Sequence, residues 1–160
     1  MGDRSPLQVY VHTADPDQHP AVLQVLTAHR LELEYELPEI SDGQLALGIR
    51  YVDFGSYLGT AAKVSSALIA AAPSAVFELW QDPYPPVAGG LYIGRVPDVG
   101  TFEVACDSDG TPLVDAGELA DSLAALPEGT TVAQWLAGPG RELLGVAVRA
   151  RLSPFERRTV

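Results

Sequence analysis

Two histidines and two carboxylates lie within eight residues near the start of the chain: His12, Asp15, Asp17 and His19. Imidazole and carboxylate groups are ligands for zinc and other first-row metals, and a strand end, a loop and a helix start can converge on an ion. The spacing His12-x6-His19 matches no established metal motif. A turn followed by a helix start accounts for the same residues, so we predict no metal. Convergence of the four side chains on an ion remains the alternative.

A second acidic group has the spacing of a calcium-binding loop. Asp107, Asp109, Asp115 and Glu118 occupy positions 1, 3, 9 and 12 of such a loop. Position 6 must be glycine for the sharp turn, and here it is Pro112. A hairpin turn followed by a helix capped by Asp115 or a neighbour accounts for these acids without calcium.

The remaining motifs do not indicate catalysis. The tripeptide Asp-Phe-Gly at 53–55 occurs without the other parts of a kinase, and there is no G-x-S-x-G hydrolase motif. The single cysteine, Cys106, is in phase with Phe102 and Val104, which predicts a buried core position rather than a nucleophile. We therefore predict no catalytic residue and no cofactor, and we lean towards a protein that is not an enzyme.

One segment has the composition of a recognition surface. Trp80, Tyr84 and Tyr92 bracket three prolines and two glycines. Aromatic side chains on a proline-stiffened loop suit the binding of a protein or a small apolar ligand. In the alternative, Trp80 and Tyr92 are core residues of adjacent strands and the prolines only shape the connection. We favour that alternative for Trp80 and Tyr92 and leave Tyr84 open.

The elements that must position these residues follow from the hydrophobic pattern. Strands are expected at residues 7–13, 31–37, 45–51 and 75–81, with helices from Pro20 to His29 and from Tyr57, capped by Ser56, to Ala72. This order, βαββαβ, predicts an α+β fold with a ferredoxin-like core on an antiparallel sheet. A hairpin (91–96 and 101–106), two short helices (116–125 and from Thr130 or Thr131 to Gly138) and a C-terminal strand (143–152) should follow. We predict one domain over residues 1–153 and a frayed tail at 154–160.

Charge is ordered along the expected strand at 31–37. Glu32, Glu34 and Glu36 alternate with apolar residues and should share one outward face. Arg149 and Arg151 have the same period in the expected C-terminal strand. We therefore predict that these two strands are neighbours joined by cross-strand ion pairs. In the alternative, each row is a separate solvated face.

Composition limits the class of protein. The chain has 160 residues, 47% hydrophobic and 19% charged, as in an ordinary globular domain rather than a disordered segment. Its formal charge of −11 argues against nonspecific binding to nucleic acid, although the last 20 residues carry +3. One cysteine excludes a disulfide framework and a cysteine-rich zinc site. Without a signal-peptide pattern or an apolar run of 18 residues, we expect a cytoplasmic protein that does not enter membranes.

These observations leave three classes of function. We favour a non-enzymatic interaction or regulatory protein with a protein partner, and a homodimer is a second arrangement. The expected binding residues are those of the aromatic–proline loop and the acidic strand: Trp80, Tyr84, Tyr92, Glu32, Glu34 and Glu36. The alternatives are a cofactor-independent enzyme or small-molecule binder of ferredoxin-like barrel type, and an acidic decoy that imitates nucleic acid.

Overall fold

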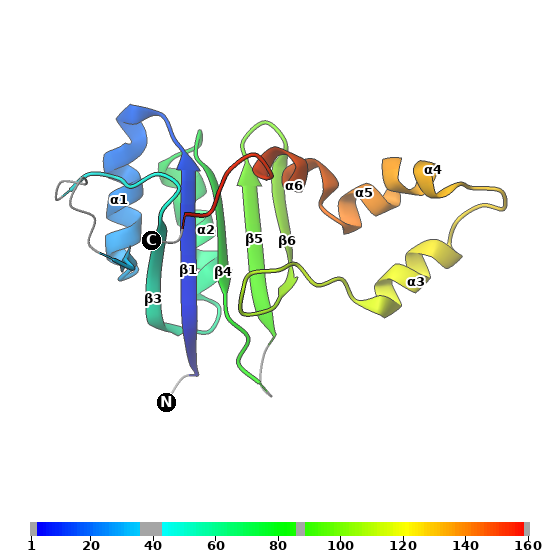
Figure 1. Cartoon of the computed structure of the whole chain (residues 1–160), viewed down its shortest axis with the longest axis horizontal. Helices are drawn as coiled ribbons and strands as arrows, with labels where there is room; N and C mark the ends of the chain where they lie inside the picture. The colour runs from blue at the N-terminus through cyan, green and yellow to red at the C-terminus, as the bar shows by residue number, and fades with distance from the viewer. Residues whose placement is uncertain (1–2, 36–42, 86–88, 159–160) are drawn as a thin grey trace.

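The computed structural model describes residues 3–35, 43–85 and 89–158. Within these residues the centre of the fold is a six-stranded antiparallel sheet in the order β2-β3-β1-β4-β5-β6 (Figure 1). The strands are β1 (Arg4–Thr13), β2 (Glu32–Leu33), β3 (Arg50–Tyr57), β4 (Val76–Gln81), β5 (Gly90–Val96) and β6 (Gly100–Cys106). The predicted α+β class and antiparallel sheet are confirmed.

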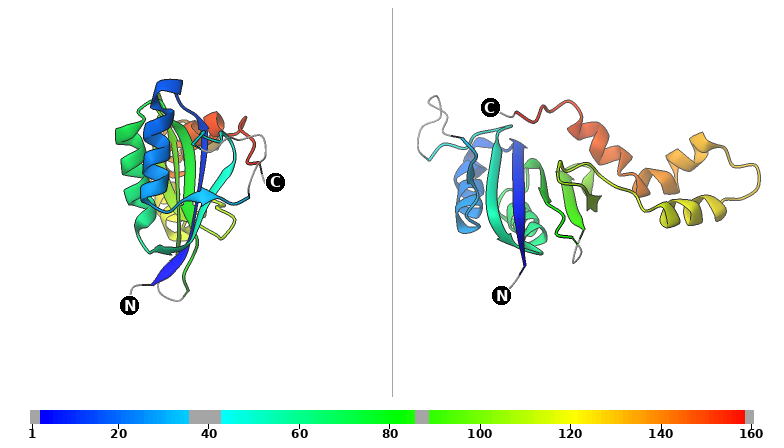
Figure 2. Two further views of the ribbon diagram at one scale, coloured as in Figure 1. Left: turned by 90° about the vertical axis from the view of Figure 1, so that its left-hand side faces the viewer. Right: turned by 60° about the horizontal axis from the view of Figure 1, so that its bottom comes forward.

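Two helices cover one face of the sheet (Figure 2, left). They are α1 (His19–Ala28), which follows the short 3-10 turn η1 (Pro16–Gln18), and α2 (Thr60–Ala71). Alternate residues of β1 enter the core beneath them, because successive side chains of a strand point to opposite faces. This core contains Leu7, Val9, Val11, Phe77 and Leu79 from the sheet and Val22, Leu26, Val64 and Leu68 from the helices. Complete burial of each side chain contributes roughly 1.5–3 kcal/mol.

The other face of the sheet is covered by the end of the chain. Tyr10, Trp80 and Tyr92 pack there with Val148 and Leu152. The last two residues belong to α6 (Val146–Leu152), which contacts β5 and β6. The protein therefore has a large core on the helical face and a smaller, more aromatic core on this second face.

A helical arm extends beyond the β6 edge (Figure 1; Figure 2, right). It consists of α3 (Ala116–Ala124), α4 (Val132–Ala137) and α5 (Pro139–Leu143). Trp135 is buried, and its indole Nε1 donates a hydrogen bond to Ser122 Oγ at 2.9 Å. No residue of α3 is buried. The arm is therefore held together by few contacts.

Local signals located several elements correctly. Asp115 caps α3 by accepting from the backbone N–H groups of Gly117 and Glu118, and Thr131 caps α4 through a capping box with Gln134. The hairpin of β5 and β6 is confirmed, with Val96 paired to Gly100. In the described part of the chain, no helix is long and apolar enough to cross a membrane.

The predicted C-terminal strand is wrong: this segment contains α6. Val148 and Leu152 are four residues apart and both are buried against the sheet, whereas Val146 is 40% exposed. Helical spacing places Val148 and Leu152 on one face of α6. The spacing of Val146 and Val148 is also that of a strand, which led to the wrong prediction. Gly145 precedes the helix in the left-handed conformation (φ +58°), which favours glycine. The segment also contains the end of α5, a helix that the sequence did not predict.

Three further boundaries differ from prediction. The strand expected at 45–51 is β3, which spans Arg50–Tyr57. β2 has only two residues, and Glu36 and Leu37 of the expected strand lie outside the described residues. Ser56 does not cap the second helix, since β3 continues to Tyr57. The helix begins at Thr60, after Gly59 at φ +81°. The strand pairs with β1 through this region, and that pairing outweighs the capping tendency of serine.

The predicted contact between the glutamate row and the C-terminal arginines is also wrong. β2 forms one edge of the sheet and α6 lies over the opposite end, at β5 and β6. Glu34 pairs instead with Arg50 of the adjacent strand, and Arg151 pairs with Asp98 in the β5–β6 turn. Arg149 and Arg151 belong to a helix, so no strand register can align them with Glu32.

Candidate functional site

The second face of the sheet has a buried carboxylate near its centre. In β4, Phe77 and Leu79 enter the core under the helices, whereas Glu78 and Trp80 point to the opposite face. The Glu78 side chain is only 6% exposed. A buried charge is costly unless it is paired and hydrogen-bonded, so the surroundings of Glu78 must supply partners.

Three side chains supply those partners. Arg157 donates from Nε to Glu78 Oε1 at 2.9 Å and from Nη2 to Oε2 at 2.7 Å. Tyr92 donates its hydroxyl to Oε2 at 3.0 Å, and His12 Nε2 lies 3.0 Å from Oε1. Burial alone raises the pKa of Glu78, but the hydrogen bonds from Arg157 and His12 outweigh it and lower the pKa to about 2. Glu78 is therefore an ionised, fully paired carboxylate.

Aromatic rings surround this group, which we call the Glu78 cluster (His12, Glu78, Trp80, Tyr92 and Arg157). The Arg157 guanidinium lies 4.7 Å from the centre of the Trp80 ring, in cation–π geometry. Tyr10 stacks on Trp80 at 5.7 Å. Burial, together with the negative charge of Glu78, raises the pKa of Tyr92, so its hydroxyl remains a donor.

The tail that was expected to fray contributes to this cluster. Phe155 stacks on His12 at 4.9 Å, and the backbone N–H of Arg158 donates to Gly48 O at 3.1 Å. The prediction of a frayed tail is therefore wrong for residues 155–158. The division into a domain at 1–153 and a tail stays a prediction.

A cavity of about 510 Å³ adjoins the cluster beneath α6. Glu78 and Tyr92 form part of its wall, and the wall continues over Leu152, Phe155 and Arg157. The guanidinium of Arg157 therefore lies between a carboxylate and a space large enough for a small molecule or a side chain.

A second polar chain crosses the same face nearer the β2 edge. Arg50 donates from Nε to Glu34 Oε2 at 2.6 Å and from Nη1 to Gln8 Oε1 at 2.9 Å. Gln8 in turn donates to Asp82 Oδ1 at 2.9 Å. Burial raises the pKa of Asp82 despite this hydrogen bond. The chain neutralises Glu34, so the predicted acidic face carries less free charge than its sequence indicates.

An acidic groove of about 530 Å³ lies between the outer edge of β6 and the arm. Its polar lining includes the carboxylates of Glu103, Asp115, Glu118 and Glu142. Its apolar lining includes Val104, Leu113 and Leu143. The loop after β6 covers the end of its outer edge, because Cys106 forms an isolated bridge with Pro112 and Leu113 N–H donates to Ala105 O at 2.7 Å. Among the described residues, no strand pairs with the rest of that edge, at 100–104, which lines this groove. We call this feature the β6 groove.

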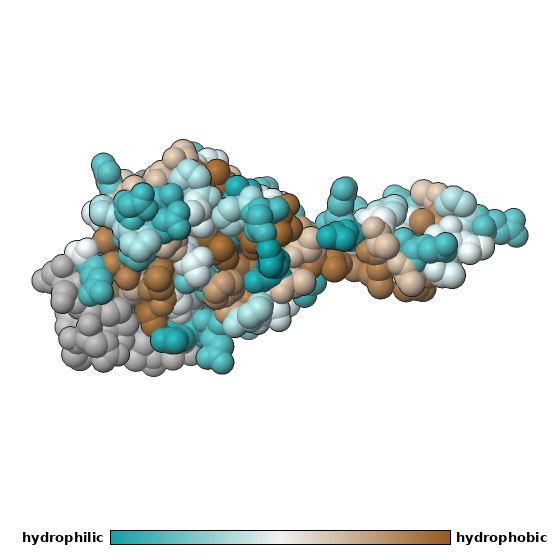
Figure 3. All heavy atoms as spheres, turned by 90° about the horizontal axis from the view of Figure 1, so that it is seen from above, coloured by the Kyte–Doolittle hydropathy of each residue, from teal (hydrophilic) through white to brown (hydrophobic). Residues whose placement is uncertain are grey.

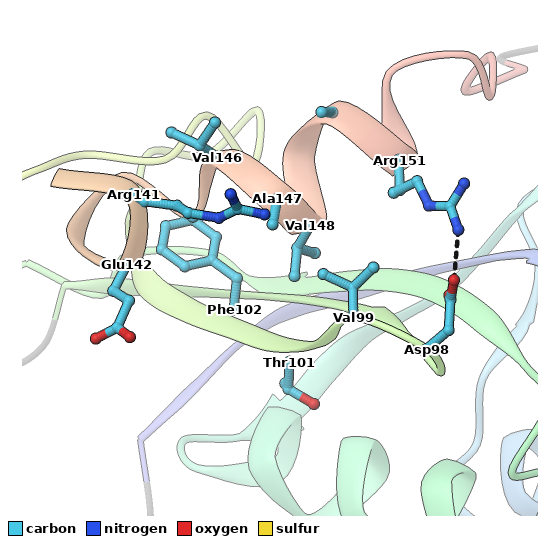
Figure 4. A pocket seen from close by; sticks show the side chains of 12 residues that line it. Asp98, Val99, Thr101, Phe102, Arg141, Glu142, Val146, Ala147, Val148 and Arg151 are labelled. Carbon is cyan, nitrogen blue, oxygen red and sulfur yellow. Dashed lines mark hydrogen bonds and ion pairs between the residues drawn. The ribbon is translucent and has the colours of Figure 1, made fainter. Parts of the chain in front are cut away.

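A larger cavity of about 870 Å³ lies above the hairpin turn, between β6 and the helices α5 and α6 (Figure 4). Phe102 rises from β6 into its centre and Val99 lies beside Val148 (Figure 4). The exposed ion pair of Asp98 and Arg151 closes one end. Its polar lining also includes Thr101, Arg141 and Glu142.

The structure describes five of the six predicted binding residues, and they lie in different parts of the sheet. Trp80 and Tyr92 are buried on the second sheet face, where their packing matches the core alternative, whereas Tyr84 is exposed. Glu32 is exposed at the β2 edge, far along the sheet from Tyr92. Glu34 pairs with Arg50. Glu36 lies outside the described residues.

Sequence reasoning missed the residues at the centre of the cluster. A signal for Glu78 was present, since a charge inside the apolar run AVFELWQ must find a partner when that strand is buried. No local signal identifies Arg157 as that partner, because the two residues are 79 positions apart.

The candidate metal and calcium ligands have structural roles within the fold. His12 contacts Glu78, whereas His19 contacts the carbonyl of Ala14, so the four residues His12, Asp15, Asp17 and His19 do not converge. Asp107 accepts from two backbone N–H groups of its own turn, and Asp115 caps α3. Over residues 3–35, 43–85 and 89–158, no group of three or more His, Cys, Asp or Glu side chains is placed to hold a metal ion.

Comparison with known proteins identifies no relative. No protein-family model matches the chain, and neither the curated proteins nor the solved structures contain a match.

Proposed function

We propose that this chain is a non-enzymatic interaction protein that binds a basic, extended segment of a protein partner in the β6 groove. The observation that carries the proposal is the combination of an open strand edge and an acidic, partly apolar wall. An exposed edge offers unpaired backbone donors and acceptors, which an incoming strand can satisfy. The carboxylates then favour lysine or arginine side chains on that strand.

The charge of the arm supports a basic partner. Residues 113–143 contain five acids and one base, Arg141, which is a net charge of −4. Two copies of this chain placed edge to edge would bring Glu103, Glu118 and Glu142 of each copy together. Repulsion between like charges disfavours that arrangement. We therefore assign the groove to a different protein rather than to a second copy.

Exposed apolar side chains on the arm support the same proposal. Leu113, Leu123, Val132 and Leu136 are all exposed, and Leu123 retains 44% of its surface. Apolar surface continues from the body onto the arm (Figure 3). Contiguous exposed apolar surface is typical of protein interaction sites. Leu113, which precedes α3, also lines the β6 groove, so a segment bound there would contact it.

Other expectations from the sequence stay proposals. The order of the elements β1-α1-β2-β3-α2-β4, and the neighbours β2-β3-β1-β4 in the sheet, support a ferredoxin-like core. A role for Tyr84 or Glu32 in binding, a cytoplasmic location and a homodimer are proposed on the sequence alone. The alternatives of a cofactor-independent enzyme and an acidic decoy are also untested.

An NMR titration tests the groove with two defined probes. The ¹⁵N-labelled protein is titrated with acetyl-(Lys-Val)4-amide and with acetyl-(Glu-Val)4-amide. We expect the lysine peptide alone to shift the backbone amides of residues 100–104, and added salt should weaken its binding because surface charges are screened.

A pair of charge variants completes that experiment. The double variant Glu103→Gln/Glu142→Gln removes two charges from the groove and should bind the lysine peptide several-fold more weakly. Asp15→Asn/Asp17→Asn removes two exposed charges before α1 and should bind it as the wild type does. Equal weakening in both variants, or shifts confined to other strands, would contradict the proposal.

A further inference from the structure

We propose that the second face of the sheet contains a binding site for a guanidinium group, which Arg157 of the same chain occupies in this structure. An external guanidinium ligand can take the site when residues 153–158 lift away. These six residues are called the strap below. The site is separate from the β6 groove and does not depend on the function proposed for that groove.

The contacts of Arg157 match what a guanidinium group requires. Nε and Nη2 form a two-pronged hydrogen bond with Glu78, at 2.9 and 2.7 Å. Nη1 donates to the carbonyl of Asp109 at 3.2 Å, and the Trp80 ring covers the flat face of the group at 4.7 Å. The Glu78 carboxylate and the Trp80 ring together favour guanidinium over ammonium. A guanidinium group can donate two parallel hydrogen bonds to the carboxylate while its flat face lies on the ring, and an ammonium group cannot.

The walls of the site are assembled without the strap. Tyr92 and His12, from β5 and β1, hold the Glu78 carboxylate in place. Trp80 is fixed by Tyr10 on one side and by a hydrogen bond from its Nε1 to Ser108 O at 3.2 Å.

The turn after β6 supports the same ring. Gly110 lies so close to the Trp80 ring that an added Cβ would be 2.4 Å from it. The strap supplies the guanidinium and the Phe155 ring that stacks on His12, so its departure would leave the carboxylate of Glu78, the carbonyl of Asp109 and the face of the Trp80 ring.

Most of the strap is exposed to solvent. Ser153, Pro154 and Glu156 are exposed, and the Arg157 side chain keeps 34% of its surface in solvent. Outside the site, the strap is held by the stacking of Phe155 on His12 and by backbone hydrogen bonds. Ser153 and Phe155 donate to carbonyls of α6, and Arg158 donates to Gly48 O and forms an isolated bridge with Ile49.

A cavity of about 510 Å³ lies beside Glu78 and Tyr92, and Ser153, Phe155 and Arg157 of the strap form part of its wall. When the strap leaves, this space opens further and gives room for the rest of an incoming ligand. A tethered Arg157 competes at an effective concentration in the millimolar range, so an external ligand should bind the wild type weakly and a strap-free site more tightly.

The test replaces the internal ligand with an external one. Arg157→Ala empties the site, and N-ethylguanidinium at low millimolar concentration is the probe, with ethylammonium as the matched cation. Binding is followed by the shift of the Trp80 indole N–H in NMR spectra and by the melting temperature. We expect N-ethylguanidinium to bind Arg157→Ala at least tenfold more tightly than wild type and to raise its melting temperature, with no such effect of ethylammonium.

A second variant makes the result decisive. Glu78→Gln/Arg157→Ala lacks the carboxylate and should not respond to N-ethylguanidinium. The proposal is overturned if Arg157→Ala responds equally to both cations, or if it responds no more than the double variant. If Arg157→Ala does not fold alone, N-ethylguanidinium should restore its folding and ethylammonium should not. Failure of that rescue also overturns the proposal.

Two larger probes distinguish the source of the ligand. Acetyl-Gly-Arg-Gly-amide represents an arginine within a partner protein, and agmatine represents a free guanidinium compound. Tighter binding of the peptide to Arg157→Ala indicates a protein partner, and tighter binding of agmatine indicates a small molecule. Either order of affinities supports the proposed site. If neither probe binds to Arg157→Ala, the proposal is contradicted.

Discussion

Replacing Glu78 with glutamine should remove a large, pH-dependent part of the stability of this protein. The carboxylate has a pKa of about 2 in the folded protein, against an ordinary value of 4.5. Each unit of difference corresponds to about 1.4 kcal/mol, so ionised Glu78 stabilises the fold by about 3 kcal/mol at neutral pH. Glutamine keeps the size of the side chain but not its charge. In a chain of this length the loss corresponds to a melting temperature lower by roughly 6–12 °C.

The sign of the pH dependence follows from the direction of the shift. Because the folded pKa is lower than the unfolded pKa, the stabilisation is complete above about pH 4.5 and disappears as the pH falls towards 2. The free energy of unfolding should be measured by urea denaturation of both proteins at several values between pH 7 and pH 3. The difference between wild type and Glu78→Gln should be constant down to about pH 5 and then narrow. The other carboxylates are present in both proteins, so their titration cancels in this difference.

Glu128→Gln is the matched control, since Glu128 is exposed. It removes one negative charge and should leave the free energy of unfolding within about 0.5 kcal/mol of wild type. Two results would refute the reasoning about Glu78: no destabilisation by Glu78→Gln at pH 7, or a difference that is the same at pH 3 as at pH 7. The second result would assign the effect to packing rather than to charge.

Three further predictions concern the second sheet face and the hairpin. Gly145→Ala should destabilise the protein by roughly 2–4 kcal/mol in urea unfolding, because Gly145 has φ +58° and a Cβ would lie 2.3 Å from the Phe102 ring; wild-type stability would contradict this packing. Cys106 should resist thiol reagents in the folded protein, since burial raises its pKa to about 12; rapid labelling at pH 8 would show that the thiol is accessible. Asp98→Asn should leave the melting temperature unchanged, because its ion pair with Arg151 is exposed to solvent; a clear decrease would show that this pair anchors α6.

The two proposed sites need different kinds of partner. The β6 groove offers an open backbone edge and free carboxylates, so it suits an extended basic segment. The Glu78 cluster offers one fully paired carboxylate under a strap, so it suits a single guanidinium group that displaces Arg157. Glu103→Gln should affect only the first site and Arg157→Ala only the second, so the two proposals can fail separately.

Local sequence determined the elements whose signals are contained within a few residues. Asp115 and Thr131 begin helices because their side chains accept hydrogen bonds from the next turn, and that geometry involves four consecutive residues. Leu7, Val9 and Val11 share one face of β1 because the period of a strand is two. The antiparallel hairpin at 90–106 follows from two apolar runs joined by a short turn.

Tertiary structure decided everything that depends on distant residues. The segment 146–152 is short, and the spacing of its apolar residues fits a strand as well as a helix. The helix forms because Val148 and Leu152 are buried together against the sheet. The sequence around Glu32 and Glu34 predicts an acidic face. In the folded protein, the strand order places Arg50 next to Glu34 and the C-terminal arginines at the other end of the sheet. The pairing of Glu78 with Arg157 and the open edge of β6 exist only once the strands are ordered, because no local pattern specifies which strand lies at an edge or which distant side chain neutralises a buried charge.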